Sequence, residues 1–209
     1  MTYWAFTDPS GGKAAAASAA HRKVRALQAA IVIASDHLSR IFVLHSWSGR
    51  LTPTKYLDKL VDLCDKFNPK VFGIEANAMQ SLFADLVHTT AKARLGSHRA
   101  RFLPVNQPTK IDKFFRIRTT LEPVINQGRL FIPSHMTELL ADIRGFPTIQ
   151  LFDRIDCLAS AIALVPSKPL AKRRTEETEA LASYLRETGM PSHYIEQRIK
   201  EVESGNDSL

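Results

Sequence analysis

The stretch VFGIEANAM, residues 71–79, begins as a buried strand and then places a glutamate, Glu75, directly after four mostly apolar residues. A short apolar run of this kind is typical of a strand in a sheet core. Burying a carboxylate is costly unless a counter-charge or hydrogen bonds compensate it. The position of Glu75 therefore raises the question of which group compensates its charge in the folded chain.

The segments that precede this stretch predict an antiparallel meander. Residues 3–8 (YWAFTD), 29–35 (AAIVIAS) and 40–47 (RIFVLHSW) are rich in β-branched and aromatic residues. The last two runs are separated by DHLS, which has the residue types of a tight hairpin turn. We expect these three strands to lie side by side.

Helices alternate with strands from residue 52 onward. Thr52 and Pro53 have the residue types of a helix start, and apolar residues then recur at three- and four-residue steps. The alternation predicts an α/β fold whose mixed five-stranded sheet combines the meander with parallel strands. Later helices and one short strand or hairpin arm, GRLFIP, are expected in this order: helix 112–126, GRLFIP, helix 134–144 and helix 153–165.

Composition and charge favour a polyanionic partner and give no sign of a membrane segment. The chain has 209 residues and a net charge of +7, and no apolar run approaches the roughly 20 residues that span a bilayer. Its two cysteines lack metal-ligand spacing. Basic residues gather in runs that suit a phosphate backbone, although a solvated helix face is the alternative for each run. These runs are HRKVR (21–25), KARLGSHRAR (92–101), KIDKFFRIR (110–118) and KPLAKRR (168–174).

Four carboxylates stand where a purely structural role is hard to find. Asp8 ends the first strand, Glu75 ends the strand at 70–75, and Asp153 and Asp156 begin an apolar helix. The alternatives are a turn before Pro9 for Asp8, and helix capping for Glu75 and Asp153. Adjacent strand ends and a crossing helix would nevertheless bring these anions together, and their repulsion needs a counter-charge.

Hard divalent cations supply that counter-charge. Mg²⁺ prefers oxygen ligands and is commonly held by a few carboxylates together with substrate phosphate. Two such ions about 4 Å apart activate a water on one side of a phosphodiester and stabilise the departing oxygen on the other. The sequence therefore predicts that Asp8, Glu75, Asp153 and Asp156 are catalytic and bind Mg²⁺ or Mn²⁺, as two ions.

The order of motifs resembles the nuclease domain of the large terminase subunit of tailed bacteriophages. The motifs are FTDPSGG, SGRLTPTKYLDKL, NPKVFGIEANAMQ, TKIDKFFRIRTTLEPVINQGRLFIP and DRIDCLASAIAL, and the match covers residues 3–165. It implies a ribonuclease-H-like fold and a metal-dependent endonuclease that cuts concatemeric double-stranded viral DNA during packaging. It also implies that the protein acts in the cytoplasm of an infected bacterial cell.

The same resemblance assigns roles to individual residues. Asp8 and Glu75 carry over as the strand acids, and Asp156 as the last catalytic aspartate, with Asp153 in the preceding ligand position. The family often has His-Asp-Asp at this helix start, where the present chain has Phe-Asp-Arg, so the division of labour between Asp153 and Asp156 stays open.

A cationic helix face is expected beside the metals. The stretch DKFFRI resembles a segment that lies beside the active site in the family. It predicts a catalytic role for Lys113 and DNA contacts for Lys113 and three further residues, with an exposed helix face as the alternative. The further residues are Lys110, Arg116 and Arg118.

The resemblance also bears on domains and partners. The nuclease domain is expected at residues 1–167, followed by a basic linker and charged helical tail at 168–209. No GxxxxGK[ST] phosphate loop is present, so the ATPase motor of a terminase is expected to belong to a longer chain. Portal protein and the small terminase subunit are the further partners implied.

Two other functions fit the same residues. A Holliday-junction resolvase, or another ribonuclease-H-like nuclease, shares the helix that carries two acids. A module that binds DNA or portal protein without catalysis is a second alternative, in which the acids only shape the fold.

Overall fold

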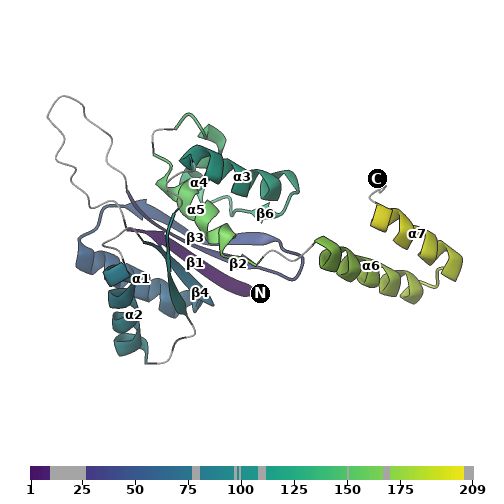
Figure 1. Ribbon diagram of the computed structural model, residues 1–209, viewed down its shortest axis with the longest axis horizontal. Coiled ribbons are helices and arrows are strands. Elements are labelled where there is room, and N and C mark those ends of the chain that lie inside the picture. The colour runs from purple at the N-terminus through teal and green to yellow at the C-terminus, as the bar shows by residue number, and fades with distance from the viewer. Residues whose placement is uncertain are drawn as a thin grey trace. The chain divides into compact units, whose positions relative to one another are not determined.

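The computed structural model describes residues 1–9, 27–76, 81–96, 98, 100–107, 112–149, 151–166 and 170–204, without the side chains of residues 81, 82, 170–177 and 201–204. These residues form two compact units, Met1–Val165 and Pro166–Leu209. The first unit is a six-stranded sheet with helices on both faces (Figure 1). Its strands are β1 (Thr2–Asp8), β2 (Gln28–Ser35), β3 (Ile41–Gly49), β4 (Val71–Glu75), β5 (Arg101–Val105) and β6 (Leu130–Phe131). Its helices are α1 (Pro53–Phe67), α2 (Ser81–Leu95), α3 (Lys113–Asn126), α4 (Thr137–Gly145) and α5 (Asp153–Ala163).

The predicted meander is confirmed. β1 pairs antiparallel with β2, and β2 pairs antiparallel with β3. Asp36 shapes the hairpin between β2 and β3, because its Oδ1 accepts hydrogen bonds from the N–H groups of Leu38 at 3.0 Å and Arg40 at 2.9 Å. Ser39 takes a φ of +59° in this turn.

Parallel strands extend the sheet on both sides of the meander. The order is β5-β4-β1-β2-β3-β6, in which β4 runs parallel to β1 and β5 runs parallel to β4. The sequence predicts this mixed α/β arrangement, in which parallel strands extend an antiparallel meander. The sixth strand adds to the five expected: β6 arises within GRLFIP and pairs parallel with the start of β3 over two residues.

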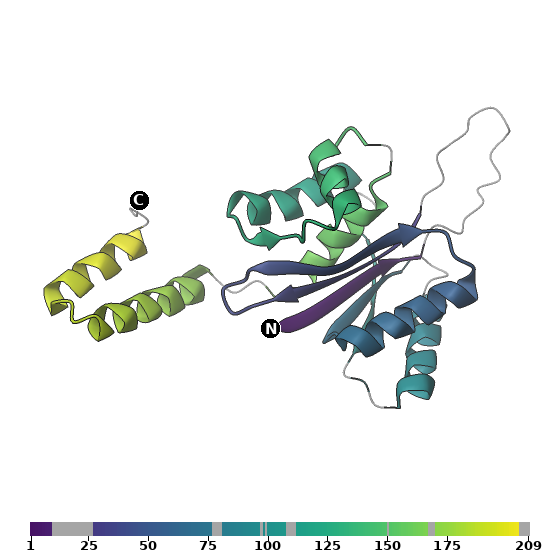
Figure 2. The same ribbon diagram turned by 180° about the vertical axis from the view of Figure 1, so that it is seen from behind.

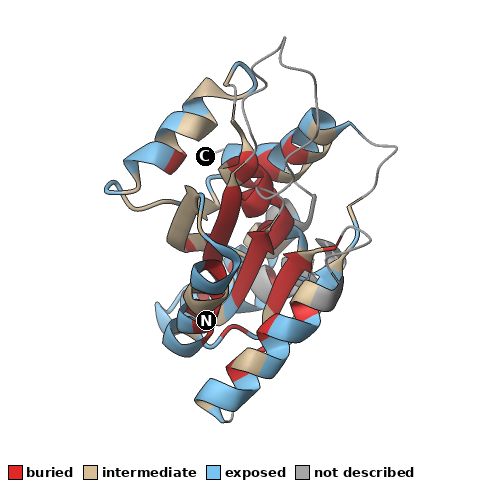
Figure 3. Ribbon diagram, turned by 90° about the vertical axis from the view of Figure 1, so that its left-hand side faces the viewer, coloured by how far each residue is buried: buried red, intermediate tan, exposed pale blue. Residues whose placement is uncertain are grey.

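Alternation along the strands divides the core between the two faces of the sheet. Trp4 and Phe6 of β1 pack beneath α3, α4 and α5, whereas Ala5 packs against α1 and α2. Seen from behind, α1 and α2 cover one face and α3 to α5 the other (Figure 2). The central strands are buried on both sides (Figure 3).

Local signals explain where the helices begin and end. α1 begins at Pro53 after Thr52, although the Thr52 side chain makes no capping hydrogen bond. It ends where Asn68 adopts the left-handed conformation (φ +43°) and its N–H bonds to the Cys64 carbonyl at 2.8 Å. α3 begins where the Asp112 side chain accepts from the Phe115 N–H at 3.1 Å, which is an N-cap.

The second unit is a helical hairpin of α6 (Leu170–Glu187) and α7 (Ser192–Ser204). Its small core contains Ala182, Leu185 and Ile195. Gly189 permits the turn between the helices with a φ of +77°. No helix in the described parts of either unit is long and apolar enough to cross a bilayer.

Candidate metal centre

Two carboxylates meet at the ends of neighbouring parallel strands. Asp8 is the last residue of β1 and Glu75 the last of β4. The register pairs Thr7 with Ile74, so one further step along both strands sets Asp8 level with Glu75. Because side chains alternate, Asp8 follows Phe6 onto the face that α5 covers, and Glu75 follows Gly73 onto the same face.

The third carboxylate comes from α5, which lies across β1 and β2. Small residues let this helix approach closely, and the Cys157 thiol donates to the Phe6 carbonyl at 3.2 Å. This contact sets the first turn of α5 above the end of β1. Asp156, one residue earlier, therefore points at the strand ends and is only 3% exposed.

Asp8, Glu75 and Asp156 form one cluster. One carboxylate oxygen of each lies within 4.8 Å of an oxygen of the other two. Asp8 and Asp156 are buried and Glu75 is half-buried. Three carboxylates from three elements thus face one small space, as the sequence predicts for these residues.

Glu75 is the member of the cluster whose surroundings disfavour its charged form. Burial, together with the charges of Asp8 and Asp156, raises the pKa of Glu75 to about 7 against the opposing effect of Lys113 and Arg116. A carboxyl with this pKa is largely protonated in slightly acidic solution. Burial first, and the neighbouring anions second, disfavour the charged form of this carboxyl.

Two cations from α3 compensate Asp156. Lys113 Nζ lies 2.9 Å from Asp156 Oδ2, and the guanidinium of Arg116 pairs with Asp156 Oδ1. Burial lowers the pKa of Lys113, but the charges of Asp156, Asp153 and Asp8 outweigh burial and raise it. Lys113 therefore remains cationic throughout the neutral range.

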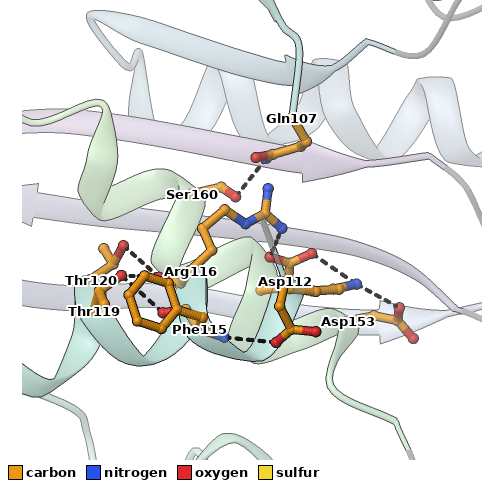
Figure 4. A network of polar contacts seen from close by, with 10 residues as sticks. Gln107, Asp112, Phe115, Arg116, Thr119, Thr120, Asp153 and Ser160 are labelled. Carbon is orange, nitrogen blue, oxygen red and sulfur yellow. Dashed lines mark hydrogen bonds and ion pairs between the residues drawn. The ribbon is translucent and has the colours of Figure 1, made fainter. Parts of the chain in front are cut away.

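Asp153 lies at one side of the cluster and is not part of it. Its Oδ2 accepts from the Leu27 N–H at 2.9 Å, and its Oδ1 is 4.0 Å from Lys113 Nζ. In the polar network of α3 and α5, Asp153 lies on the far side from Gln107 (Figure 4). The expected convergence of four carboxylates is thus a cluster of three with a fourth linked to it through Lys113. Asp153 is also not an N-cap, since Phe152 occupies the N-cap position of α5, where its side chain makes no capping hydrogen bond.

The predicted DNA-binding residues have different surroundings. Lys113 and Arg116 both pair with Asp156, so in the free protein each already has a carboxylate partner. Arg118 points away from the cluster and pairs with Glu122 at 3.1 Å on the exposed face of α3. Lys110 lies outside the described residues, as do residues 21–25 of the first basic run.

The chemistry of the donor set fits a hard divalent cation. Three carboxylates converge, which are the ligands that Mg²⁺ and Mn²⁺ prefer. Asp8, Glu75 and Asp156 are the residues that would hold such an ion, and Lys113 would give up its bond to Asp156.

The sequence alone did not indicate the residues that support the cluster. On the other face of β1, Thr7 donates to the Ala29 carbonyl at 2.8 Å, and the Tyr56 hydroxyl bonds to both Thr7 and the Asp8 carbonyl. This buried pair fixes the backbone from which Asp8 projects. Tyr56 resembles any apolar-face residue of α1, so no sequence signal distinguishes it.

Gln107 also carries no distinguishing sequence signal. It follows β5, and its side chain donates to the Ser160 hydroxyl at 2.9 Å, beside the guanidinium of Arg116 (Figure 4). The stretch VNQPT reads only as a loop. Its proximity to α5 depends on the parallel pairing of β5 with β4.

No family model and no curated protein matches the chain. Among solved structures, T. thermophilus RuvC in complex with a Holliday junction substrate aligns at 12% identity and a TM-score of 0.45, over 77% of this chain and 91% of that one. The yeast mitochondrial Holliday junction resolvase Ydc2 aligns at 13% identity and a TM-score of 0.43, over 65% of this chain and 73% of that one. The nuclease domain of the large terminase subunit gp2 of bacterial virus Sf6, with manganese, aligns at 10% identity and a TM-score of 0.49, over 80% and 90%. These likenesses concern the fold, and the case for a metal centre comes from the carboxylates of this chain.

Proposed function

We propose that this protein is a divalent-metal-dependent DNA endonuclease. The observation that carries the proposal is the convergence of Asp8, Glu75 and Asp156 within 4.8 Å at the end of the central strands. A nuclease needs such a cluster beside cations that hold a phosphate backbone. α3 supplies those cations at the same place.

The chain's own groups position substrate and metal. Asp8, Glu75 and Asp156 hold Mg²⁺ or Mn²⁺, which when bound supplies the Lewis acidity for attack of water on phosphorus and for departure of the 3′-oxygen. Lys113, released from Asp156, bonds to a phosphate oxygen of the DNA. Arg116 keeps Asp156 oriented, because its guanidinium is less exposed than the Lys113 amine, 18% against 36%.

The three converging carboxylates could hold one ion in the free protein, and a second ion would enter with substrate. A second ion would need additional anionic ligands. The scissile phosphate brings such ligands. Asp8, Glu75 and Asp156 would then hold two ions together with the scissile phosphate, and hydrolysis would leave 5′-phosphate and 3′-hydroxyl ends.

At the finer level, we propose that the protein is the nuclease domain of a phage terminase large subunit, which cuts double-stranded DNA concatemers in the cytoplasm of an infected bacterium. The order of its motifs supports this role. An ATPase domain of a longer chain, the small terminase subunit and the portal protein are the partners that such a role requires. Cleavage would be largely independent of sequence and sensitive to salt, because contacts to phosphates dominate.

Plasmid cleavage tests the site, the cofactor and the reaction class together. Supercoiled plasmid is incubated with the protein and Mg²⁺, Mn²⁺ or EDTA, and nicked and linear forms are measured. We expect cleavage with either ion, none with EDTA, and a loss of at least about 100-fold in Asp8→Asn and Asp156→Asn. Asp62→Asn, at an exposed position of α1, is the matched control and should cut like the wild type. Equal nicking by the wild type and both site variants would show that the cluster is not catalytic.

The substrate class needs a second comparison. Linear duplex, a four-way junction and an RNA/DNA hybrid are cut under the same metal concentration. A terminase role predicts that linear duplex is cut at least as well as the others. Strong preference for the junction would instead assign the protein to the resolvases, and preference for the hybrid to the ribonucleases H.

A further inference from the structure

A small pocket lies directly beside the carboxylate cluster, between the end of β5, α3 and α5. Its volume is about 130 Å³. Ser160 on its wall follows Asp156 by one turn of α5, and Gln107 on its rim follows Val105, which pairs with Glu75 in the sheet. A DNA strand held at the cluster therefore passes the mouth of this pocket.

One buried group of a residue that lines the pocket lacks a hydrogen-bond partner. Arg116 Nη1 is inaccessible to solvent and meets no acceptor among the residues that the structure describes. The same guanidinium bonds to Asp156 through Nη2. An unsatisfied buried N–H is unfavourable, so an acceptor that reaches this group as a ligand enters the pocket would stabilise the complex.

The acceptor that fits is neutral. The charge of Arg116 is already balanced by Asp156, and the described lining contains no other charged side chain. A phosphate that entered the pocket would lose its hydrating water and would meet no unpaired cation among the described lining residues. Waters can occupy the pocket in the free protein, because its volume exceeds that of one water several times.

The walls favour a flat, largely apolar ligand. Val105, Ala159 and Leu164 line the pocket, with Gln107, Arg116 and Ser160 as its polar groups. A nucleobase has apolar faces, and its edge carries carbonyl oxygens and ring nitrogens. Arg116 Nη1 can donate to such an acceptor, and an amide such as Gln107 both donates and accepts, as base recognition requires.

We propose that this pocket binds the base of a nucleotide flanking the scissile phosphate. The proposal rests on the proposed nuclease function, since that function places DNA at the cluster. It adds a sequence preference at one flanking position to an otherwise sequence-independent enzyme. Gln107 and Arg116 read the base edge, and the base displaces the waters of the pocket.

A library experiment tests the proposal on the active enzyme. Duplexes of random sequence are cut with Mn²⁺, and the bases on both sides of each cut are counted by sequencing. We expect one flanking position to favour one base by at least about fivefold. Ala163→Leu fills the pocket from an exposed rim position, so it should flatten this preference and change the average cutting rate by less than about threefold. Gln107→Leu removes the amide and should also flatten the preference.

Controls and an independent measurement decide the remaining outcomes. Ala141→Leu, at an exposed site of α4, is the matched control and should keep the wild-type preference. A flat wild-type profile, or one that Ala163→Leu leaves unchanged, overturns the proposal. If the protein cuts no DNA, nuclear magnetic resonance decides the pocket separately from the proposed function. Deoxynucleosides should then shift the side-chain signals of Gln107 and Arg116 where deoxyribose 5-phosphate does not, and the absence of such shifts overturns the proposal.

Discussion

At the scale of single residues, the raised pKa of Glu75 makes the stability of the metal-free protein depend on pH. Burial and the charges of Asp8 and Asp156 raise its pKa to about 7, above its ordinary value of 4.5. Between pH 4.5 and 7 the folded protein without metal then binds more protons than the unfolded chain. The contribution of Glu75 to stability is thus fully present below pH 4.5 and is lost as pH rises through 7.

Glu75→Gln removes this pH dependence. In EDTA at pH 8, we expect the variant to unfold at a higher temperature than the wild type. Its free energy of unfolding should be larger by on the order of 1–3 kcal/mol, whereas at pH 5 the two proteins should differ little. Differential scanning calorimetry from pH 5 to 8 measures the difference. With Mg²⁺ the wild type should become the more stable of the two proteins, because only the wild type has the Glu75 carboxylate as a ligand for the ion. A difference that stays constant across this pH range would contradict the assignment of the shifted group to Glu75.

Lys113 competes with the metal for Asp156. We expect Lys113→Met to destabilise the metal-free protein by about 1–3 kcal/mol, because Asp156 loses a charged partner. The same variant should bind Mn²⁺ several-fold more tightly in the absence of DNA, since the ion no longer displaces an amine. Isothermal titration calorimetry measures that affinity. Lys113→Arg keeps the charge and serves as the control, and weaker Mn²⁺ binding in Lys113→Met would contradict the competition.

At the scale of elements, α5 must come close to the strands for Asp156 to reach the cluster. Gly73 is one reason that it can: a Cβ at this position would lie 2.6 Å from Phe6 Cδ2 and 2.9 Å from Leu164 Cδ1. Side chains of the core have little room to give way, because protein interiors are close-packed.

A side chain at position 73 is therefore expected to push α5 away. Gly73→Val should destabilise the protein by at least about 1–3 kcal/mol through overpacking. It should also reduce the rise in unfolding temperature that Mn²⁺ gives, because Asp156 moves with the helix. Gly96→Ala, where a Cβ meets open space but the φ of +68° is strained, controls for loss of stability without a change at the cluster. An unchanged metal response in Gly73→Val would show that α5 does not depend on this contact.

The elements themselves could be predicted from sequence, but several contacts between them could not. Periodicity and turn residues predict each helix and strand, because these signals are local. The acids at strand ends can be predicted for the same reason. The pairing of Lys113 and Arg116 with Asp156, and of Gln107 with Ser160, depends on how α3 and β5 lie against α5. That packing arises from contacts between distant residues, which leave no periodic trace in the chain. The side position of Asp153 follows from its bond to Leu27, 126 residues earlier.

At the scale of the whole molecule, the two units have separate cores. The core residues of the sheet unit and those of the hairpin formed by α6 and α7 share no member. Small units bury a smaller fraction of their surface and are correspondingly less stable. The hairpin, at residues 166–209, should therefore unfold before the sheet does.

The positions of the tryptophans make this order measurable. The chain has two tryptophans, Trp4 on β1 and Trp47 on β3, so their fluorescence reports on the sheet unit, whereas far-ultraviolet circular dichroism reports on both units. On heating, we expect circular dichroism to fall in two steps, of which only the second coincides with the change in fluorescence. A fragment of residues 1–167 should lose the first step and keep the second within about 2–4 °C, the shift that 1 kcal/mol produces in a protein of this size. The fragment should also keep the stabilisation by Mn²⁺, because every ligand of the cluster lies in the sheet unit. Coincident single transitions in the full chain, or a large fall in the unfolding temperature of the fragment, would mean that the hairpin helps to hold the sheet together.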